Sequence, residues 1–217
     1  MGMGKWVAAG IGVAAVAGVA AVAQYREESE EPSYKSVAKE KRFELRDYEP
    51  MIVAEVTHNG DRRRASGASF RRLAAYIFAQ DRPGGERERI AMTSPVIQDR
   101  VDQNQRIAMT SPVIQEETGS DQWRMRFVMP ARFTMDTLPT PPSDITLSEV
   151  PARRVAAVRF NGYGGSADIA KMEGELSSWI ASKQLKPVGD FEYAFYDAPM
   201  VPGPRRRNEV LIEVAAE

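Results

Sequence analysis

The chain has one histidine and no cysteine, and these two facts limit the chemistry that it can support. A Ser-His-Asp triad or an imidazole metal ligand could involve only His58, and a site that needs two imidazoles is excluded within one chain. The absence of cysteine excludes disulfides, thiolate ligands and nucleophilic thiols. His58 is therefore the single candidate for an imidazole ligand.

Motifs for catalysis are sparse. The Gly-rich stretch 162–165 lacks the Lys-Ser/Thr pair of a phosphate-binding loop, and no G-x-S-x-G elbow occurs. Asp190, Glu192 and Asp197 lie close in sequence, but such carboxylates are common on surfaces. The formal net charge of −1 gives no reason to expect nucleic acid as a partner. We predict a protein that is not an enzyme.

Arginines form two clusters whose guanidinium groups could pair bidentately with carboxylates of a ligand. Basic clusters of this kind are also common on solvated faces. The first cluster precedes and enters a predicted helix, and the second lies near the C-terminus. The clusters comprise Arg62, Arg63, Arg64, Arg71 and Arg72, and Arg205, Arg206 and Arg207.

A long-range repeat indicates the elements that must position these residues. Residues 53–60 align with residues 155–162 at an offset of 102, and each run alternates apolar positions before ending in Asn-Gly. Such runs are typical of a strand followed by a turn. The offset places Phe160 at the position equivalent to His58, which favours packing of an aromatic ring, or exposure at the surface, over metal ligation.

Helical periodicity follows each of these turns, and strands are predicted after each helix. The predicted strands lie at 43–46, 89–97, 106–114, 123–129, 145–150, 189–196 and 209–214, in addition to the two aligned runs. We therefore predict an α+β domain at 41–217, with duplicated β-β-α-β-β halves at about 41–130 and 144–215. Its antiparallel sheet or distorted barrel should have about eight strands, with two helices packed on it.

A second repeat is local and complete. Residues 89–98 recur without change as residues 106–115, at an offset of 17. Pro95 and Pro112 each remove one backbone donor, so the strands should be at an edge, bent or broken there. The polar residues 99–105 could turn the chain so that the two copies pair.

The N-terminus predicts a membrane-directed segment. Residues 6–23 carry no charge, and as a helix they would span about 27 Å. Lys5 and the Ala21-Val22-Ala23 sequence are typical of a cleaved signal peptide, and an uncleaved anchor is the alternative. The basic residue before the span and the glutamates after it predict a domain outside the cytoplasm. Residues 24–40 are interpreted as a flexible tether.

Five short motifs resemble the SOUL heme-binding family over roughly residues 41–215. They are R-F-E-L-R-D-Y at 42–48, I-A-M-T-S-P-V at 90–96 and again at 107–113, F-V-M-P at 127–130, Y-D-A-P-M at 196–200 and R-R-N-E-V at 206–210. The resemblance implies a duplicated α+β fold and a capacity to bind heme or another tetrapyrrole.

A heme site needs an apolar slot, cations for two propionates and, in many proteins, an axial ligand. The candidate slot joins one face of the first helix to methionines and aromatic side chains elsewhere, with His58 as the possible iron ligand. Its other residues are Phe70, Arg71, Ala74, Ile77, Met92, Met109, Tyr196, Met200 and Arg206. The predicted function is heme binding outside the cytoplasm, with buffering or transport of heme as its purpose. The alternative is a general small-molecule-binding or interaction module of the same fold.

Overall fold

The computed structural model describes residues 29–85, 87–101, 122–198 and 200–215. In chain order its elements are β1 (Tyr34–Glu40), β2 (Phe43–Tyr48), β3 (Met51–Asn59), α2 (Arg62–Ile77), the 3-10 turn η1 (Pro83–Gly85), β4 (Val96–Arg100), β5 (Gln122–Val128), β6 (Thr146–Val150), β7 (Arg153–Asn161), α3 (Ser166–Ser182), β8 (Pro187–Phe195), the 3-10 turn η3 (Gly203–Arg205) and β9 (Arg207–Val214). The predicted α+β class is confirmed, with nine antiparallel strands in one curled sheet.

The sheet topology confirms the duplication. The strands run β1-β2-β7-β9-β8-β4-β5-β3-β6. Without β1, exchanging each strand of one half for its counterpart in the other gives the same order read in reverse. Tyr48 pairs with Arg153 and Met51 pairs with Val150, so the two pairs are related by the 102-residue offset seen in the sequence. The halves meet at three strand pairs, β4 with β8, β2 with β7 and β3 with β6.

Local sequence accounts for the equivalent strand-to-helix turns. Gly60 and Gly162, which end the two aligned runs, have φ values of 111° and 122°, a region that favours glycine. Asp61 then caps α2 because its carboxylate accepts the N–H groups of Arg63 and Arg64. Helix α2 can therefore begin with only two residues between it and β3, whereas four residues separate α3 from β7, and Gly165 is the N-cap of α3.

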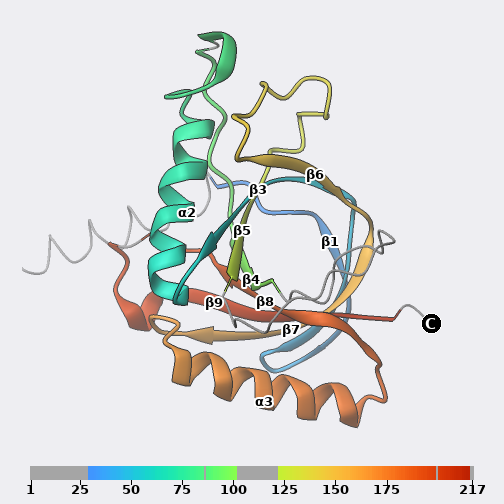
Figure 1. Ribbon diagram of the computed structural model, residues 1–217. Helices are drawn as coiled ribbons and strands as arrows, with labels where there is room; N and C mark the ends of the chain where they lie inside the picture. The colour runs from blue at the N-terminus through green and yellow to red at the C-terminus, as the bar shows by residue number, and fades with distance from the viewer. Residues whose placement is uncertain (1–28, 86, 102–121, 199, 216–217) are drawn as a thin grey trace, which may run out of the picture.

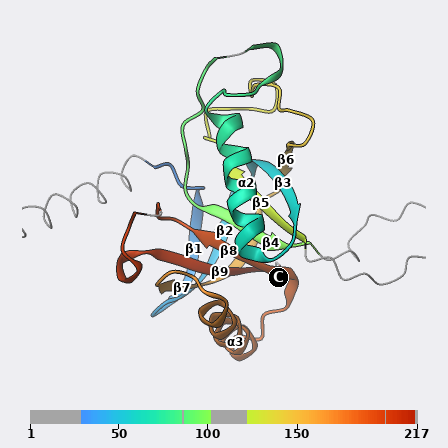
Figure 2. The same ribbon diagram turned by 60° about the vertical axis from the view of Figure 1, so that its left-hand side comes forward.

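The two faces of the sheet bury different kinds of side chain. Both helices pack on the outer face of the curl, and α3 lies roughly crosswise to α2 (Figures 1 and 2). Leu176 and Trp179 of α3 pack with Val158 and Val210, and Leu73 of α2 belongs to a second core against β3 and β5. The inner face carries two smaller apolar clusters and most of the buried ion pairs.

Two short connections draw the ends of the sheet together. Only Glu49 and Pro50 separate β2 from β3, and only residues 151–152 separate β6 from β7. In each case the joined strands lie near opposite ends of the strand order. Since two residues span at most about 7 Å, the sheet must curl until these ends approach each other.

Some predicted element bounds were wrong. Residues 34–40, interpreted as part of a tether, form β1, whose backbone pairs with β2 although every side chain is exposed. The strand predicted at 89–97 begins only at Val96, after Pro95, which has no N–H group to donate. The second copy at 106–114 and the N-terminal segment 1–23 lie outside the described residues. No helix in the described part of the chain is long and apolar enough to cross a membrane.

Candidate functional site: a groove where the sheet closes

A groove lies where the two ends of the sheet approach each other. Its volume is about 440 Å³, within the roughly 300–1,000 Å³ of small-molecule sites. Its walls come from residues 30–33, the β2–β3 turn, the residues after β5 and the β6–β7 turn. The apolar wall consists of Met51, Ile52, Val128, Met129, Phe133 and Val150.

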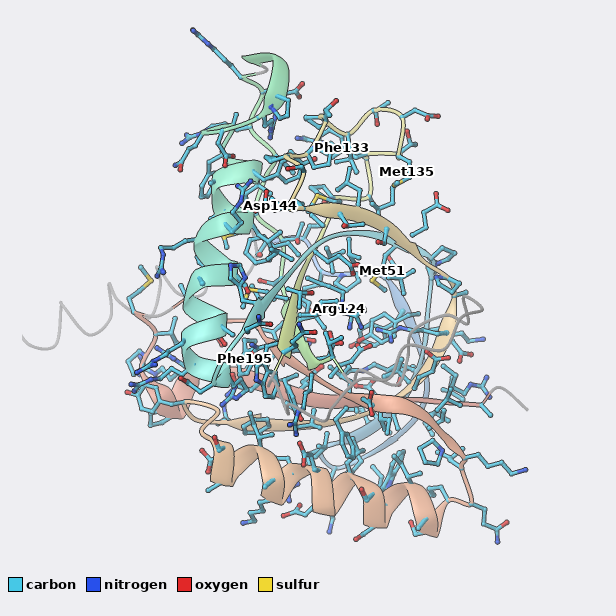
Figure 3. The ribbon with its side chains drawn as sticks, viewed as in Figure 1. Met51, Arg124, Phe133, Met135, Asp144 and Phe195 are labelled. Carbon is cyan, nitrogen blue, oxygen red and sulfur yellow. The ribbon has the colours of Figure 1, made fainter. Side chains whose placement is uncertain are left out.

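Prolines interrupt backbone pairing around this groove. Pro50, Pro130 and Pro151 line it, and none of them has an N–H group to continue a ladder. Met129 makes the last link in this region, donating its N–H to the carbonyl of Ile52 at 2.8 Å. Beyond this point side chains, rather than a further strand, line the space. Figure 3 shows Met51 inside the curl and Phe133 on the segment beyond β5.

The segment before β1 forms one wall and is held by polar contacts. The backbone N–H of Ala131 donates to the Glu30 carboxylate at 2.6 Å. Ser94 donates its N–H to the Glu30 carbonyl at 2.8 Å, and its hydroxyl lies 2.9 Å from that of Ser29. Glu31 receives two hydrogen bonds from Arg207, at 2.9 and 3.0 Å. Residues that are far apart in the sequence, Ser94, Ala131 and Arg207, thus hold this wall of the groove in place.

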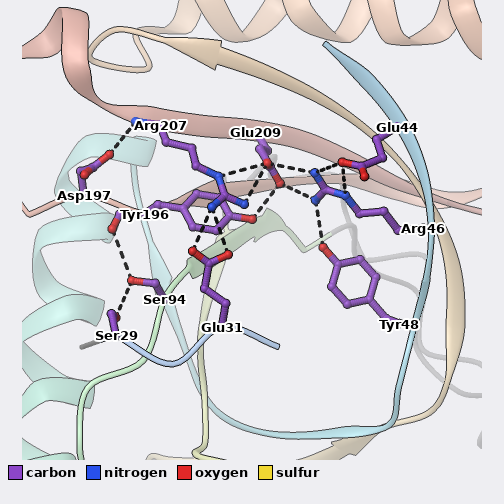
Figure 4. Close-up of polar contacts among 10 residues, drawn as sticks. All are labelled: Ser29, Glu31, Glu44, Arg46, Tyr48, Ser94, Tyr196, Asp197, Arg207 and Glu209. Atoms are coloured by element: carbon purple, nitrogen blue, oxygen red, sulfur yellow. Dashed lines mark hydrogen bonds and ion pairs between the residues drawn. The ribbon is translucent and has the colours of Figure 1, made fainter. Parts of the chain in front are cut away.

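Next to this wall, a buried ion network covers part of the inner face (Figure 4). The guanidinium of Arg46 donates to both carboxylate oxygens of Glu209, at 2.7 and 3.1 Å, and also bonds Glu44 and Tyr48. Arg207 and the hydroxyl of Tyr196 donate to the same Glu209 carboxylate. The Glu209 side chain is fully buried, so these partners replace its water.

The network shifts the pKa of its members in directions that follow from its geometry. Burial alone would raise the pKa of Glu209, but the hydrogen bonds and charge of Arg46 and the charge of Arg207 hold that pKa below its usual value. Burial raises the pKa of Tyr48 to about 12, and the pKa of Tyr196 is also raised. At neutral pH Glu209 is therefore charged and both phenols are protonated.

A second network continues along the inner face. Arg126 lies 3.0 Å from carboxylate oxygens of both Asp99 and Glu192, and Arg153 pairs with Glu192 at 2.6 Å. Burial opposes ionisation of Glu192, but the charges of Arg126 and Arg153 lower its pKa to about 2. The charges of this second network are thus paired with one another, and none of these side chains lines the groove.

The groove itself combines an apolar wall with an acidic rim. Glu30, Glu31, Glu49 and Glu149 line it, and all four are exposed. No histidine, tyrosine or arginine is among the described residues that line the groove, so on these described walls the thioethers of Met51 and Met129 are the only soft donor groups. Among the described residues, no group of three or more His, Asp or Glu side chains is placed to hold a metal ion.

The slot predicted from the sequence does not form as one pocket. Phe70 and Ile77 of α2 lie on the outer side of the sheet, where Phe70 packs edge-on to Phe127 and Ile77 is buried core. Met92 packs against the same core. Tyr196 lies on the inner side, bonded to Glu209. The sheet therefore separates residues that the prediction placed together.

The other predicted slot residues do not meet in one place either. Ala74 is partly buried on α2 and Arg71 is exposed there. Met200 is 81% exposed, while Arg206 donates to the Val201 carbonyl and lies over the ring of Tyr163. Met109 lies outside the described residues.

His58 is on the outer side of the sheet, beneath α2. Its Nδ1 lies 2.9 Å from the hydroxyl of Ser69, a residue with no exposed surface. Its counterpart Phe160 is buried in the core beneath α3. The equivalence seen in the sequence therefore corresponds to two positions that pack under a helix, away from the groove.

Sequence reasoning missed most of the groove because turn residues build it. The F-V-M-P motif at 127–130 was recognised, and three of its residues line the groove. A usable signal was the pair of prolines that follow equivalent strands of the two halves, Pro50 after β2 and Pro151 after β6. Their proximity depends on closure of the sheet, which the local pattern does not reveal.

These features define a duplicated α+β domain with a curled sheet and a groove at its closure. The chain belongs to the SOUL heme-binding protein family, whose model matches residues 29–213. The curated proteins contain no match to this sequence.

Solved structures share the fold at low sequence identity. A hydrolase from Listeria innocua is 10% identical, with a TM-score of 0.52 over 82% of this chain and 94% of its own. The EcmrR C-terminal domain is 13% identical, with a TM-score of 0.55 over 85% of this chain and 99% of its own. An EcmrR–DNA complex also matches, over 81% of this chain and 57% of that chain, at 13% identity and a TM-score of 0.55. At these identities the likeness concerns the fold alone.

Proposed function

We propose that this protein binds heme or a related tetrapyrrole, without turning it over, in the groove where the sheet closes. Membership of the SOUL family supports the ligand class. The observation that supports the location is the apolar wall around Met51, open to solvent and of small-molecule size. Buffering or transport of heme would follow from binding alone.

The groove fits the two parts of heme unequally. The wall of Ile52, Val128, Phe133 and Val150 suits the apolar ring, and Met51 could offer its sulfur to the iron. When bound, heme supplies an iron that takes axial ligands and changes oxidation state. Glu31 is paired with Arg207, but Glu30, Glu49 and Glu149 leave the rim negative and repel propionates, so the propionates should remain on the solvent side. Binding then depends mainly on apolar burial of the ring.

A titration of the full-length chain with hemin tests this proposal. We expect a saturable change in the Soret band, and Ala131→Trp should weaken it at least tenfold. Ala131 is exposed and lines the groove, and its contact to Glu30 uses the backbone, so a larger side chain fills the groove without removing that contact. The matched control is Ala170→Trp, an exposed position on α3. Equal binding by both variants would refute the location, and no saturable binding by the wild type would refute the ligand.

The acidic rim supports a second candidate, an apolar ligand that carries positive charge. Four carboxylates beside an apolar wall attract such a ligand and repel an anionic one. The variant Glu49→Gln/Glu149→Gln separates the two candidates, because both side chains are exposed and their loss should leave the fold intact. Hemin should bind this variant more tightly than wild type, whereas a cationic apolar dye should bind it more weakly. The general binding module therefore remains the alternative to heme.

We also propose that the domain lies outside the cytoplasm, exported or anchored by residues 1–23. The uncharged span after Lys5 and the glutamates that follow it support this orientation. Mass spectrometry of the native N-terminus would distinguish a cleaved signal from an anchor. A chain recovered with its N-terminus intact in the soluble cytoplasmic fraction would contradict both.

A further inference from the structure

We propose that the tandem repeat gives this chain two interchangeable strands for one position in the sheet. In the structure the first copy, residues 89–98, leads into and occupies the β4 position. The second copy, residues 106–115, carries the same ten residues in the same order. Residues 102–121 lie outside the described part of the chain, so only their sequence is used. Exchange would slide the chain by 17 residues through the β4 position.

Every specific contact of the first copy can be made by the second. Ile90 donates its N–H to the Ile77 carbonyl, and Thr93 donates its hydroxyl to the Val128 carbonyl. Ser94 bonds the Glu30 carbonyl, and Gln98 accepts from Ser66. The equivalent residues Ile107, Thr110, Ser111 and Gln115 are identical in type, so they satisfy the same partners.

The residue that follows each copy carries a carboxylate, which can pair with the arginines of β5. Asp99 is buried and accepts hydrogen bonds from Arg124 and Arg126. Its equivalent after the second copy is Glu116, which also carries a carboxylate. The buried arginines would therefore keep an anionic partner in either arrangement, which avoids the large cost of an unpaired buried charge.

The exchange also produces an acceptable connection to β5. At present residues 101–121 join β4 to β5, and the N–H of Val101 donates to the Gln122 carbonyl. In the exchanged form Thr118 would make this bond, leaving Gly119, Ser120 and Asp121 as the turn. A three-residue loop that contains glycine is typical of a β-hairpin.

The two arrangements should have similar free energies. They place the same ten residue types at the same positions, six of them buried in the first copy, and move 17 residues from the loop after β4 to the loop before it. The entropy of closing a loop grows only with the logarithm of its length, so this transfer changes the balance by a factor of about ten or less. Both forms should therefore be populated. The 17 additional residues follow β4 in one form and precede it in the other.

Disulfide trapping tests the exchange directly, and the chain has no cysteine of its own to interfere. Ile97 pairs with Ala194 of β8, within the Cα separation that a disulfide accepts. Under mild oxidation, Ile97→Cys/Ala194→Cys should trap the first form and Ile114→Cys/Ala194→Cys the second. The matched control, Asp102→Cys/Ala194→Cys, has no place in either strand. If the Ile114 pair cross-links no more than the control, the proposal is overturned.

A stability cycle gives a second test that does not depend on cross-linking. Ile97 is buried, so placing a charge there should prevent the first copy from occupying the strand position. Because the second copy replaces it, Ile97→Asp should lower the folding equilibrium constant by only about tenfold, and Ile114→Asp by no more. The double variant should lower it more than a hundredfold. An Ile97→Asp variant as unstable as the double variant, or a double variant as stable as wild type, would overturn the proposal.

Discussion

Replacement of Arg46 by methionine is the sharpest test of how the inner face is stabilised. The change keeps a long side chain and removes five hydrogen bonds, two to Glu209, two to Glu44 and one to Tyr48. Glu209, whose side chain has no exposed surface, would keep only Arg207 and Tyr196 as charged or polar partners. The variant therefore leaves a buried carboxylate poorly compensated.

The expected loss follows from this geometry. Removing one member of a buried ion pair typically costs about 3–5 kcal/mol of unfolding free energy. Since Arg207 remains close to Glu209, we expect a value near the lower limit, about 3 kcal/mol. Such a loss is a large fraction of the roughly 5–15 kcal/mol that stabilises a typical domain.

Urea unfolding at pH 7, followed by fluorescence, measures this loss. The matched control is Arg154→Met, because Arg154 also makes a two-pronged contact, with Asp47 at 2.7 and 2.9 Å, but both side chains are partly exposed, by 26% and 41%. The control should lose less than about 1 kcal/mol. If Arg46→Met loses no more than the control, the buried network is not a major source of stability and the reasoning fails.

Three further predictions concern pH, the histidine and the core. As the pH falls from about 4.5 towards 2, the unfolding free energy should decrease, because the pKa of Glu192 is about 2 in the folded protein against an ordinary 4.5, so the unfolded chain takes up its proton first. Glu192→Gln should weaken this pH dependence. If the variant showed the same dependence as wild type, the low pKa of Glu192 would be contradicted. His58→Ala should leave the spectrum of bound hemin unchanged, since His58 lies under α2 beside Ser69, and loss of the Soret change would show that it is a ligand. Leu176→Ala should lower the unfolding free energy by about 2–5 kcal/mol, because Leu176 is fully buried on the face of α3 that packs on the sheet. A loss below about 1 kcal/mol in urea would be inconsistent with that packing.

The sequence revealed the parts of the fold that repeat a local pattern. The runs around Val53 and Val155 alternate at period two and end in Asn-Gly, so both strands and both following turns could be located. The two helices could be predicted equally well, because their buried residues recur at helical spacing. The duplication then followed from the order of these elements.

The parts that were missed depend on contacts between distant residues. Strand β1 has seven exposed side chains and no alternating pattern, so only its pairing with β2 identifies it. The groove combines turns that come together when the sheet closes, and no periodicity marks Pro50 or Pro151. The predicted slot failed because helix α2 and Tyr196 lie on opposite faces of the sheet, which depends on strand order rather than on sequence spacing.

The central claim is that the ligand occupies the groove beside Met51. The most direct test is a methyl NMR spectrum of the methionine-labelled protein, recorded with and without hemin, because paramagnetic iron broadens nearby methyl signals. The methyl signals of Met51 and Met129 should be lost on binding, while that of Met172, on the buried face of α3, should persist. Retention of both groove signals at saturating hemin, or loss of the Met172 signal before them, would contradict the account.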